Sequence, residues 1–404
     1  MSENGPGRPH RRSLLGRIDS APPVDAIEIA EDELVDVVGA SDVSLLIADY
    51  SGRCVVRFDR STWASAGARQ RGVDLAEPVA LPGTVYERVL QGQRVDIRES
   101  DGGVWLTVPV TVRGDALGVL EMRLPERPTA QTLTEVTEVA DAFGYAIVAN
   151  RRSTDLFEWG RRTVPFTLAA EIQRRLLPSS FSCDAPQFSL AAWLEPAYDV
   201  GGDTFDYALD RETLHLSITD AVGNDVRAAL LATLLVGSLR NGRRRVMDLA
   251  EQVRTANDAL AAHSSTGEFV TGQVARVDLR DGTMTIVNAG HPFPILMRDG
   301  RVAEVELDID IPFGLYPGRE FRLQRIALQP RDRILFVTDG VLDRNSTHVD
   351  VPTVLAQTAD QHPREVVHEL SDAVTTASGG ELRDDSTVLC LDWRGPDPTV
   401  GRSR

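Results

Sequence analysis

Four acidic positions in this 404-residue chain share one local pattern: each carboxylate lies in a turn beside a segment with the character of a strand. They are Asp203 after Gly201-Gly202, Asp220 after "LHLSIT", Asp339 after "RILFVT", and the pair Asp384-Asp385 before "STVLCLDW". Rigid scaffolds place functional groups on loops at strand ends. Each aspartate taken alone is best interpreted as an ordinary turn residue, because Asp is common in turns. Taken together, the four positions indicate a cluster.

A cluster of carboxylates requires a counter-charge. Two carboxylates about 4 Å apart repel by about 4 kcal/mol at an effective dielectric constant near 20. A fold that gathers them must protonate them, pair them with arginine or bind divalent cations. Ligand sets made only of oxygen favour Mg²⁺ or Mn²⁺. The seven histidines include no pair at a zinc spacing, although His291 stands near a turn in "NAGHPFP".

The elements that would position these carboxylates begin near residue 187. Seven segments from "FSLAAWLEP" to "STVLCLDW" have strand character, and Asp281-Gly282 and Asp299-Gly300 are typical hairpin turns. Helical patterns cover 226–241, 246–262 and 363–377. Many antiparallel strands with a few helices predict an α+β sandwich.

The N-terminal half predicts a separate, smaller α+β domain. An acidic helical pattern at 26–40 precedes two short strands, and 82–97 has the pattern of a helix leading into a strand. Two strands are expected within 103–124 and a helix over 132–150. We therefore predict a lead-in without structure at 1–25, one domain at 26–150, a helical linker at 151–180, a second domain at 181–395 and a tail without structure at 396–404.

The linker contains a helix that Pro165 favours at its start and Pro178 ends. Leu168, Ile172 and Leu176 recur every four residues and form one apolar stripe. The stripe is compatible with a helix packed on its own domain. It is equally compatible with a signalling helix between a sensor and an effector, paired with a second chain.

Six motifs in order resemble those of the PP2C-like (PPM) serine/threonine phosphatases: "DVGGDTFDY", "ITDAVGND", "VNAGHPFPILM", "IPFGLYP", "VTDGVLD" and "DDSTVLCL". They are most similar to the bacterial branch of sporulation and stress-response phosphatases that act on anti-sigma factor antagonists, and "LAAEIQRRLLP" resembles the helix before the domain in this branch. The resemblance covers about 166–393. It implies an α/β/β/α sandwich with two Mn²⁺ or Mg²⁺ ions at one edge and a phosphorylated anti-sigma factor antagonist as substrate.

The resemblance also implies a role for each acidic position. Asp220 corresponds to the carboxylate that bridges both ions, and the carbonyl of Ala221 to a further ligand. Asp339 and Asp384 correspond to carboxylates of the second ion, and Asp203 to the residue that binds metal-bound water. Asp385, Asn224 and Asp206 are expected to surround these ligands. Asn224 stands where the branch often carries histidine, so protonation of the leaving group by that position is not expected.

Residues 26–150 resemble a GAF domain, through "LPGTVYERVLQGQRVDI" and "WLTVPVTVRGDALGVLEM". GAF domains bind small molecules or serve as dimerisation modules. The resemblance therefore implies a regulatory sensor with an unknown small-molecule ligand, and a homodimer through the helices at 132–177.

Composition excludes several other functions. The net charge of −17 argues against a nucleic-acid surface and a polybasic membrane anchor. All 43 basic residues are arginine, which excludes a Walker-A loop, a kinase ion pair and Schiff-base chemistry. Three scattered cysteines, no apolar run of membrane-spanning length and no signal-peptide core indicate a cytoplasmic protein.

Three functions agree with these patterns. The first is a metal-dependent protein serine/threonine phosphatase controlled by the N-terminal domain. The second is a signalling scaffold that keeps the phosphatase fold with weak or no activity, which Asn224 favours and the retained carboxylates oppose. The third is a phosphatase acting on a small molecule.

Overall fold

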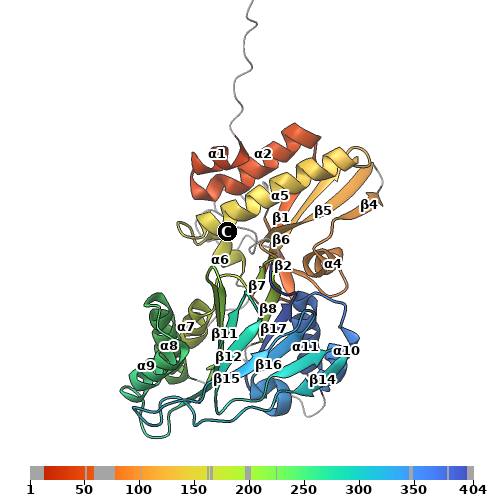
Figure 1. Ribbon diagram of the computed structural model, residues 1–404. Coiled ribbons are helices and arrows are strands. Elements are labelled where there is room, and N and C mark those ends of the chain that lie inside the picture. Colours follow the sequence, from red (N-terminus) through yellow and green to blue (C-terminus); the bar gives the residue numbers. More distant parts are fainter. Residues whose placement is uncertain are drawn as a thin grey trace, which may run out of the picture. The chain divides into compact units, whose positions relative to one another are not determined.

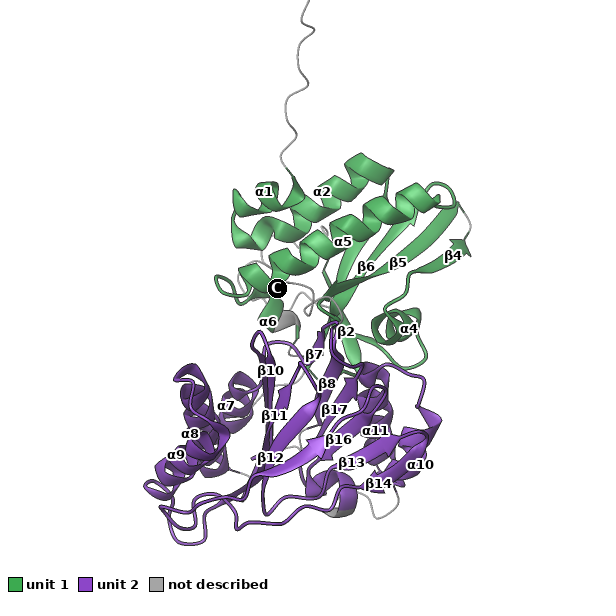
Figure 2. Cartoon of the chain, in the orientation of Figure 1, with its two compact units in different colours: residues 1–165 green, residues 166–404 purple. Residues whose placement is uncertain are grey.

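The computed structural model describes residues 13–50, 52–58, 78–100, 102–161, 163, 167–195, 202–223, 225–344, 349–379 and 382–397. They belong to two compact units, residues 1–165 and 166–404 (Figure 2). Each unit is described by itself below.

The N-terminal unit is an antiparallel sheet with helices on both faces (Figure 1). The strand order is β3-β2-β1-β6-β5-β4. The strands are β1 Ser41–Ala48, β2 Cys54–Phe58, β3 Pro78–Ala80, β4 Asp96–Ser100, β5 Gly103–Val112 and β6 Asp115–Leu124. The helices are α1 Leu14–Asp19, α2 Ala26–Val38, α4 Val85–Gly92, α5 Ala130–Asn150 and α6 Leu156–Gly160, with a 3₁₀ turn at Pro23–Asp25.

Alternation along the strands divides the apolar side chains of this unit between two cores. Leu45 and Ile47 of β1 belong to the larger core, which α1, α2 and α5 also form. Leu46, between them, belongs to the smaller core with Val85 and Val89 of α4. Successive side chains of a strand point to opposite faces, so the pattern follows from strand geometry. The resemblance to a GAF domain stays a prediction.

The expected lead-in at 1–25 needs a correction from residue 13 onward. Ser13 caps helix α1 by accepting a hydrogen bond from the backbone N–H of Gly16. Leu14 and Ile18 are buried in the core of the N-terminal unit. Residues four apart lie on the same face of a helix, so both apolar side chains reach the core. Residues 1–12 lie outside the described residues.

The C-terminal unit is a sandwich of two antiparallel sheets with the strand orders β15-β12-β11-β10-β9 and β14-β13-β16-β17-β8-β7. The strands are β7 Ser182–Asp184, β8 Phe188–Glu195, β9 Thr204–Leu209, β10 Thr213–Ala221, β11 Val270–Asp278, β12 Thr283–Ala289, β13 Ile295–Arg298, β14 Arg301–Glu304, β15 Gln324–Ala327, β16 Arg333–Val337 and β17 Ser386–Trp393. The helices are α7 Leu168–Leu176, α8 Val226–Arg244, α9 Leu249–Ala261, α10 Val351–Gln357 and α11 Pro363–Ala377, with a π-helical turn at Gly340–Arg344.

Three cores make this unit four layers deep. Phe188, Phe205 and Trp393 lie in the core between the two sheets. A second core joins α8 and α9 to the outer face of the first sheet, and a third joins α10 and α11 to the outer face of the second. The predicted α/β/β/α sandwich is therefore confirmed. Helix α11 has the predicted bounds 363–377, with Pro363 in its first turn and a capping box between His362 and Glu365.

The predicted linker at 151–180 is divided between the two units. Helix α6 belongs to the N-terminal unit, where Phe157 is fully buried in the larger core. Helix α7 belongs to the C-terminal unit and packs on α8, with Ala169 against Ala229. Leu168 of the apolar stripe is 67% exposed, whereas Leu176 is buried. Of the two alternatives, packing on its own domain is what the structure describes for α7.

Candidate active site

Three of the predicted carboxylates line one cavity of about 570 Å³ in the C-terminal unit. They are Asp220, Asp339 and Asp384, and Ala221 lines the same cavity. The remaining lining residues are Val222, Gly223, Phe269, Thr271, Gly290, His291, Pro292 and Arg383. The acidic residues come from both sheets and are up to 164 positions apart in the sequence (384 − 220). The structure therefore brings these three residues to one cavity.

Strand ends bring these residues together. Asp220 lies at the end of β10, where it pairs with Thr271 of β11. Asp339 follows β16 and Asp384 precedes β17, and these two strands are antiparallel neighbours with Val337 opposite Val388. The end of one strand and the start of the next therefore deliver two carboxylates to one point of the second sheet.

Asp203 is not among the cavity-lining residues but lies buried beside them. Its Oδ2 accepts hydrogen bonds from the hydroxyls of Thr338, at 2.8 Å, and Thr387, at 2.6 Å. The backbone N–H of Thr387 also donates to the Thr338 hydroxyl, at 3.0 Å. Because Thr338 precedes Asp339 and Thr387 follows the pair Asp384-Asp385, Asp203 ties together the two loops that carry the cavity carboxylates.

Electrostatics at Asp203 indicate a missing positive charge. Burial, together with the charges of Asp220 and Asp385, raises the pKa of Asp203 well above its usual value, although the two threonine hydroxyls oppose the rise. A buried carboxyl surrounded by like charges favours its protonated form. Cation binding next to it would restore the ionised form, so the local environment fits a cation.

Asp385 is held by a residue of helix α7. The side-chain amide of Gln173 donates to Asp385 Oδ2 at 2.6 Å and to the Asp203 carbonyl at 2.8 Å. All three groups are buried, and the Asp385 backbone N–H donates to Asp384 Oδ1 at 3.0 Å. Asp385 therefore lies next to the cavity carboxylates without lining the cavity, which agrees with its predicted place around the ligands.

Asp206 lies elsewhere than predicted. Its carboxylate on β9 accepts hydrogen bonds from Arg240, at 2.8 and 3.1 Å, and is ion-paired with Arg243 at 3.2 Å, both on α8. Arg240 also donates to the Leu176 carbonyl at 2.6 Å and so fixes the end of α7. Asp206 thus braces the α7–α8 layer and lines no part of the cavity. Asn224 lies outside the described residues.

The "NAGH" turn places a histidine at the cavity. Asn288 binds the backbone of His291 twice, accepting from its N–H at 2.8 Å and donating to its carbonyl at 2.9 Å. Gly290 has a φ of +70° and sits against Pro312, where a Cβ would be 2.9 Å from the proline ring. Burial lowers the pKa of His291 to about 3, against a smaller raising effect of the Val337 carbonyl, so the ring is neutral at pH 7.

The neutral ring is held at Nδ1, which lies 3.1 Å from the Thr271 hydroxyl. Its Nε2 is buried and has no hydrogen-bond partner among the described residues. The Val337 carbonyl is near enough to raise the pKa slightly, but it does not meet the geometry of a hydrogen bond. His291 is therefore a neutral residue of the cavity wall, with no cationic role in the protein at neutral pH.

Oxygen donors dominate the cavity, as a hard divalent cation prefers. In the described ranges, however, no three Asp, Glu, His or Cys side chains stand close enough to hold one ion together. Carboxylates brought close together repel by about 4 kcal/mol per pair without a counter-ion. The donor types and the raised pKa of Asp203 fit Mg²⁺ or Mn²⁺, provided that the side chains close by rotation upon binding.

The family described as "Stage II sporulation protein E (SpoIIE)" matches residues 210–394, which hold Asp220, Asp339 and Asp384. Residues 210–394 therefore resemble this family. The match leaves residues 1–209 uncovered, so it includes neither the N-terminal unit nor Asp203.

Curated relatives resemble part of this chain at low identity. Protein IcfG of Synechocystis sp. is 27% identical over 205 residues, which are 44% of this chain and 32% of that protein. Phosphoserine phosphatase RsbU of Bacillus subtilis is 20% identical over 231 residues, 55% of this chain and 68% of that protein. The chain thus spans about a third of the first relative and about two thirds of the second.

One similar solved structure contains the RsbU and RsbW domains of a Mycobacterium tuberculosis protein. It is 26% identical, covers 53% of this chain and 62% of its own, and has a TM-score of 0.48. A fragment of SpoIIE from Bacillus subtilis, with its PP2C phosphatase domain and part of its regulatory domain, is 15% identical with a TM-score of 0.46, and covers 77% of this chain and 85% of its own.

Four residues at or beside the cavity escaped sequence reasoning. Thr338 and Thr387 stand inside the motifs "VTDG" and "DDST", so the motifs themselves carried the signal. Gln173 lies in "LAAEIQRRLLP", where only its burial on a helix separates it from its polar neighbours. Arg383, the basic side chain that lines the cavity, directly precedes Asp384.

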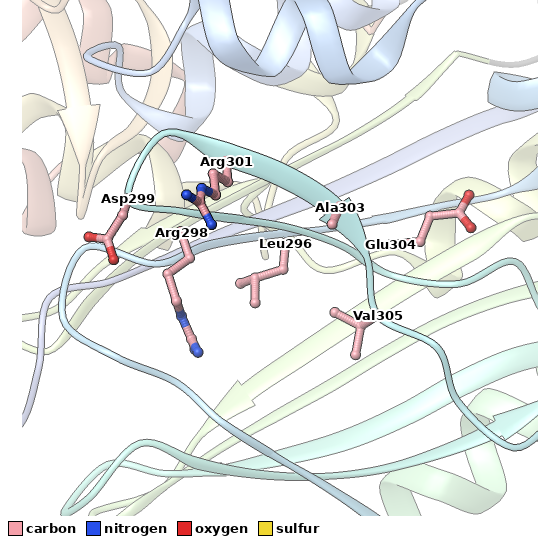
Figure 3. A pocket seen from close by; sticks show the side chains of 7 residues that line it. All are labelled: Leu296, Arg298, Asp299, Arg301, Ala303, Glu304 and Val305. Carbon is pink, nitrogen blue, oxygen red and sulfur yellow. The ribbon is translucent and has the colours of Figure 1, made fainter.

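A second cavity of about 550 Å³ lies along the hairpin of β13 and β14 (Figure 3). Arg298 in its wall donates to Asp332 at 2.5 and 2.8 Å and to the Ala327 carbonyl at 2.8 Å. The charge of this arginine is therefore already neutralised, and none of the four acidic positions of the sequence lines this cavity. It is not the site of the metal chemistry.

Proposed function

We propose that the C-terminal unit is a metal-dependent phosphatase that hydrolyses phosphoserine or phosphothreonine on a regulatory protein. The observation that carries this proposal is the cavity shared by Asp220, Asp339 and Asp384. The names of two Bacillus subtilis relatives, phosphoserine phosphatases RsbU and RsbP, support the reaction class. The proposed substrate is a phosphorylated anti-sigma factor antagonist.

In this proposal Asp220, the Ala221 carbonyl, Asp339 and Asp384 would hold two Mn²⁺ or Mg²⁺ ions. Bound divalent cations supply Lewis-acid chemistry: they neutralise charge on the phosphoryl group and activate water for in-line attack. Arg383 would bind phosphoryl oxygens from the cavity wall, because a guanidinium matches their geometry with paired N–H groups. Asp203, through Thr338 and Thr387, keeps the two carboxylate loops in register.

Regulation would come from the N-terminal unit. We propose that it senses a small-molecule ligand, that α7 passes its state to the cavity through Gln173, and that the chain works as a homodimer in the cytoplasm. The hydrogen bonds of Gln173 to Asp385 and the Asp203 carbonyl support the role of α7. Among the described helices, none is both long and apolar enough to cross a bilayer.

The proposal is tested by phosphate release from a phosphorylated anti-sigma factor antagonist. The purified chain is expected to release phosphate with Mn²⁺ present and to stop when EDTA is added, because the reaction needs the counter-charge. Turnover that EDTA leaves unchanged contradicts the metal mechanism. A scaffold without activity would bind little or no Mn²⁺ in a calorimetric titration, and a phosphatase for small molecules would leave the phosphoprotein intact.

The role of α7 gives a prediction of its own. Gln173→Ala removes the side-chain amide that donates to the buried Asp385 carboxylate and to the Asp203 carbonyl. A hydrogen bond to a charged group contributes about 1.5–3 kcal/mol. We expect kcat to fall by about tenfold or more, since 1.4 kcal/mol corresponds to a factor of ten.

A matched control for this variant is Gln252→Ala on α9. Gln252 is also buried and donates to the Leu239 carbonyl at 2.7 Å, but it lines no part of the cavity. It is expected to lower the free energy of unfolding and to leave kcat per folded molecule unchanged. Equal kcat losses in both variants would reduce the role of Gln173 to general stability.

A further inference from the structure

The motif "IPFGLYP" contributes no residue to the cavity, yet it exposes two large side chains. In the loop that follows Asp310, Leu315 is 37% exposed and Tyr316 is 64% exposed. The Tyr316 hydroxyl makes no hydrogen bond to any described residue. Single exposed apolar side chains are common on protein surfaces, so what sets Tyr316 apart is the way its loop is held.

The loop is rigid because helix α9 holds its backbone. Asn257 accepts from the Gly314 N–H at 3.0 Å and donates to the Tyr316 carbonyl at 2.9 Å. Asp258 accepts from the Gly318 N–H at 2.6 Å, and the Ser264 hydroxyl donates to the Gly314 carbonyl at 3.0 Å. These bonds fix the backbone on both sides of Tyr316 while its side chain stays in solvent.

Buried packing supports the same conformation. Gly314 has a φ of +90° and lies against Leu260, where a Cβ would be 2.9 Å from that side chain. The ring of Phe313 packs on Phe321 with centroids 5.0 Å apart, and both are buried. Glycine tolerates this positive φ, so the "FG" step turns the chain outward immediately before Leu315 and Tyr316.

The loop is attached to the rim of the cavity. Phe313 and Val270 exchange two backbone hydrogen bonds, of 2.8 and 3.0 Å, and Phe269 next to Val270 lines the cavity. Pro312 packs on Gly290, which also lines the cavity. Leu315 and Tyr316 therefore lie two and three residues after Phe313, whose partner Val270 is next to the cavity-lining Phe269.

The cavity wall also carries an exposed apolar side chain. Val222 lines the cavity, is 40% exposed, and donates its backbone N–H to the Phe269 carbonyl at 3.1 Å. Val222, Phe269, Leu315 and Tyr316 are hereafter called the docking strip. Backbone hydrogen bonds connect the three chain segments that carry these residues, from Val222 to Phe269 and from Val270 to Phe313.

We propose that the docking strip is the surface on which the folded phosphoprotein substrate binds while its phosphorylated residue enters the cavity. This inference rests on the proposed phosphatase function. A small phosphate ester would be held within the cavity and would have no use for Tyr316. A protein substrate can contact Tyr316 with its own surface while its phosphorylated residue is in the cavity. Tyrosine is among the residues that most often contribute much of the binding energy in such interfaces.

Size also favours a folded protein as the occupant. A stable complex buries about 800 Å² on each partner, so a substrate protein must contact surface outside a phosphate cavity. A tyrosine held by a fixed backbone loses little conformational freedom on binding, because only two side-chain torsions remain to be ordered. The docking strip supplies such an anchor beside the cavity mouth.

The test compares two substrates on the full chain with Mn²⁺: a phosphorylated anti-sigma factor antagonist and p-nitrophenyl phosphate. For the double variant Leu315→Ala/Tyr316→Ala, we expect kcat/KM on the phosphoprotein to fall by about tenfold or more, mainly through KM. Turnover of p-nitrophenyl phosphate should stay within about twofold, because that ester needs only the cavity. The control is Val246→Ala, at a side chain that is 89% exposed beyond the end of α8.

Each outcome decides between docking and its alternatives. Unchanged kcat/KM on the phosphoprotein in the double variant overturns the docking strip and leaves the phosphatase proposal intact. Equal losses on both substrates also overturn it, since they show a change in the cavity itself. If the parent chain is inactive on both substrates, the proposed function and the docking proposal are both overturned. A parent dimer that the double variant converts to a monomer, with phosphoprotein turnover unchanged, assigns the strip to a second copy of the chain.

Discussion

Asp220→Asn is expected to abolish Mn²⁺-dependent phosphate release. Asp220 lies at the end of β10 and lines the cavity with Asp339 and Asp384, so the substitution removes one of three converging negative charges. Loss of charge stabilisation worth about 4 kcal/mol in the transition state corresponds to about a thousandfold in rate. Phosphate release from the phosphorylated antagonist measures the rate, and calorimetric titration with MnCl₂ measures the loss of metal affinity.

The variant should remain folded, because Asp220 is one of the charges that raise the pKa of Asp203. Removing that charge relieves repulsion in the metal-free protein, so the melting temperature without Mn²⁺ should not fall. Mn²⁺ should raise the melting temperature of the parent chain and not that of the variant, since a ligand stabilises only the state that binds it. This comparison separates a metal-site effect from unfolding.

Asp299→Asn is the matched control. Asp299 is an exposed aspartate at the β13–β14 turn, beside the second cavity (Figure 3), with a φ of 49° that Asn tolerates well. It makes the same chemical change away from the carboxylates and should leave turnover and Mn²⁺ affinity unchanged. Retained turnover in Asp220→Asn would instead contradict the assignment of the cavity as the reactive site.

Elements whose signals lie within a few neighbouring residues were predictable from the sequence. The turn at Asp299-Gly300 has positive φ at both residues, 49° and 73°, as expected of this dipeptide between paired strands. Helix α11 has its predicted bounds because proline, the capping box and a regular apolar stripe all lie within a few residues of one another. Such signals need no knowledge of the rest of the chain.

Contacts between distant segments were not predictable in the same way. Gln173 meets Asp385 across 212 positions, and Thr387 meets Asp203 across 184. Nothing in the local pattern distinguishes Gln173 from the other polar residues of α7. The sequence placed the carboxylates at strand ends, but only the packing of two sheets and a helix decides which of them line the cavity.

Asp206 is a residue that the sequence placed near the site and the structure does not. It stands three residues after Asp203 and was expected near the metal ligands, yet Arg240 and Arg243 of α8 hold it. Along a strand, residues an odd number apart point to opposite faces. Asp203 and Asp206 therefore serve different layers, and their closeness in sequence was misleading.

Gly202→Ala is expected to damage both the fold and the site. The backbone N–H of Ala221 donates to the Gly202 carbonyl at 3.2 Å, so the two backbones are in direct contact. A Cβ on residue 202 would lie 2.8 Å from the Ala221 carbonyl carbon and closer still to its oxygen. Backbone atoms cannot yield as the end of a flexible side chain can, and the carbonyl concerned is the one proposed to bind metal.

The strain should lower the free energy of unfolding by about 1–3 kcal/mol, as overpacking in cores does. The effect on turnover should be larger, because a shift of about 1 Å in a positioned group costs about a hundredfold in rate. Urea unfolding gives the first quantity, and kcat at saturating Mn²⁺ on the phosphorylated antagonist gives the second. A kcat equal to that of the parent chain would show that Ala221 can move without loss, which would remove its carbonyl from the proposed ligand set.

Gly237→Ala is the control, and it is expected to raise the free energy of unfolding instead of lowering it. Gly237 lies within α8, and a Cβ there would meet no heavy atom within 4 Å. Alanine in a helix interior is more favourable than glycine by about 0.5–1 kcal/mol, so this variant should unfold at higher urea concentration. If Gly202→Ala loses activity while Gly237→Ala gains stability at unchanged activity, the requirement for glycine at 202 comes from the contact with Ala221 and not from the residue type. The glycine of "GGD" would then serve to let two backbones approach, so that Asp203 is presented beneath the cavity and the Ala221 carbonyl at its edge.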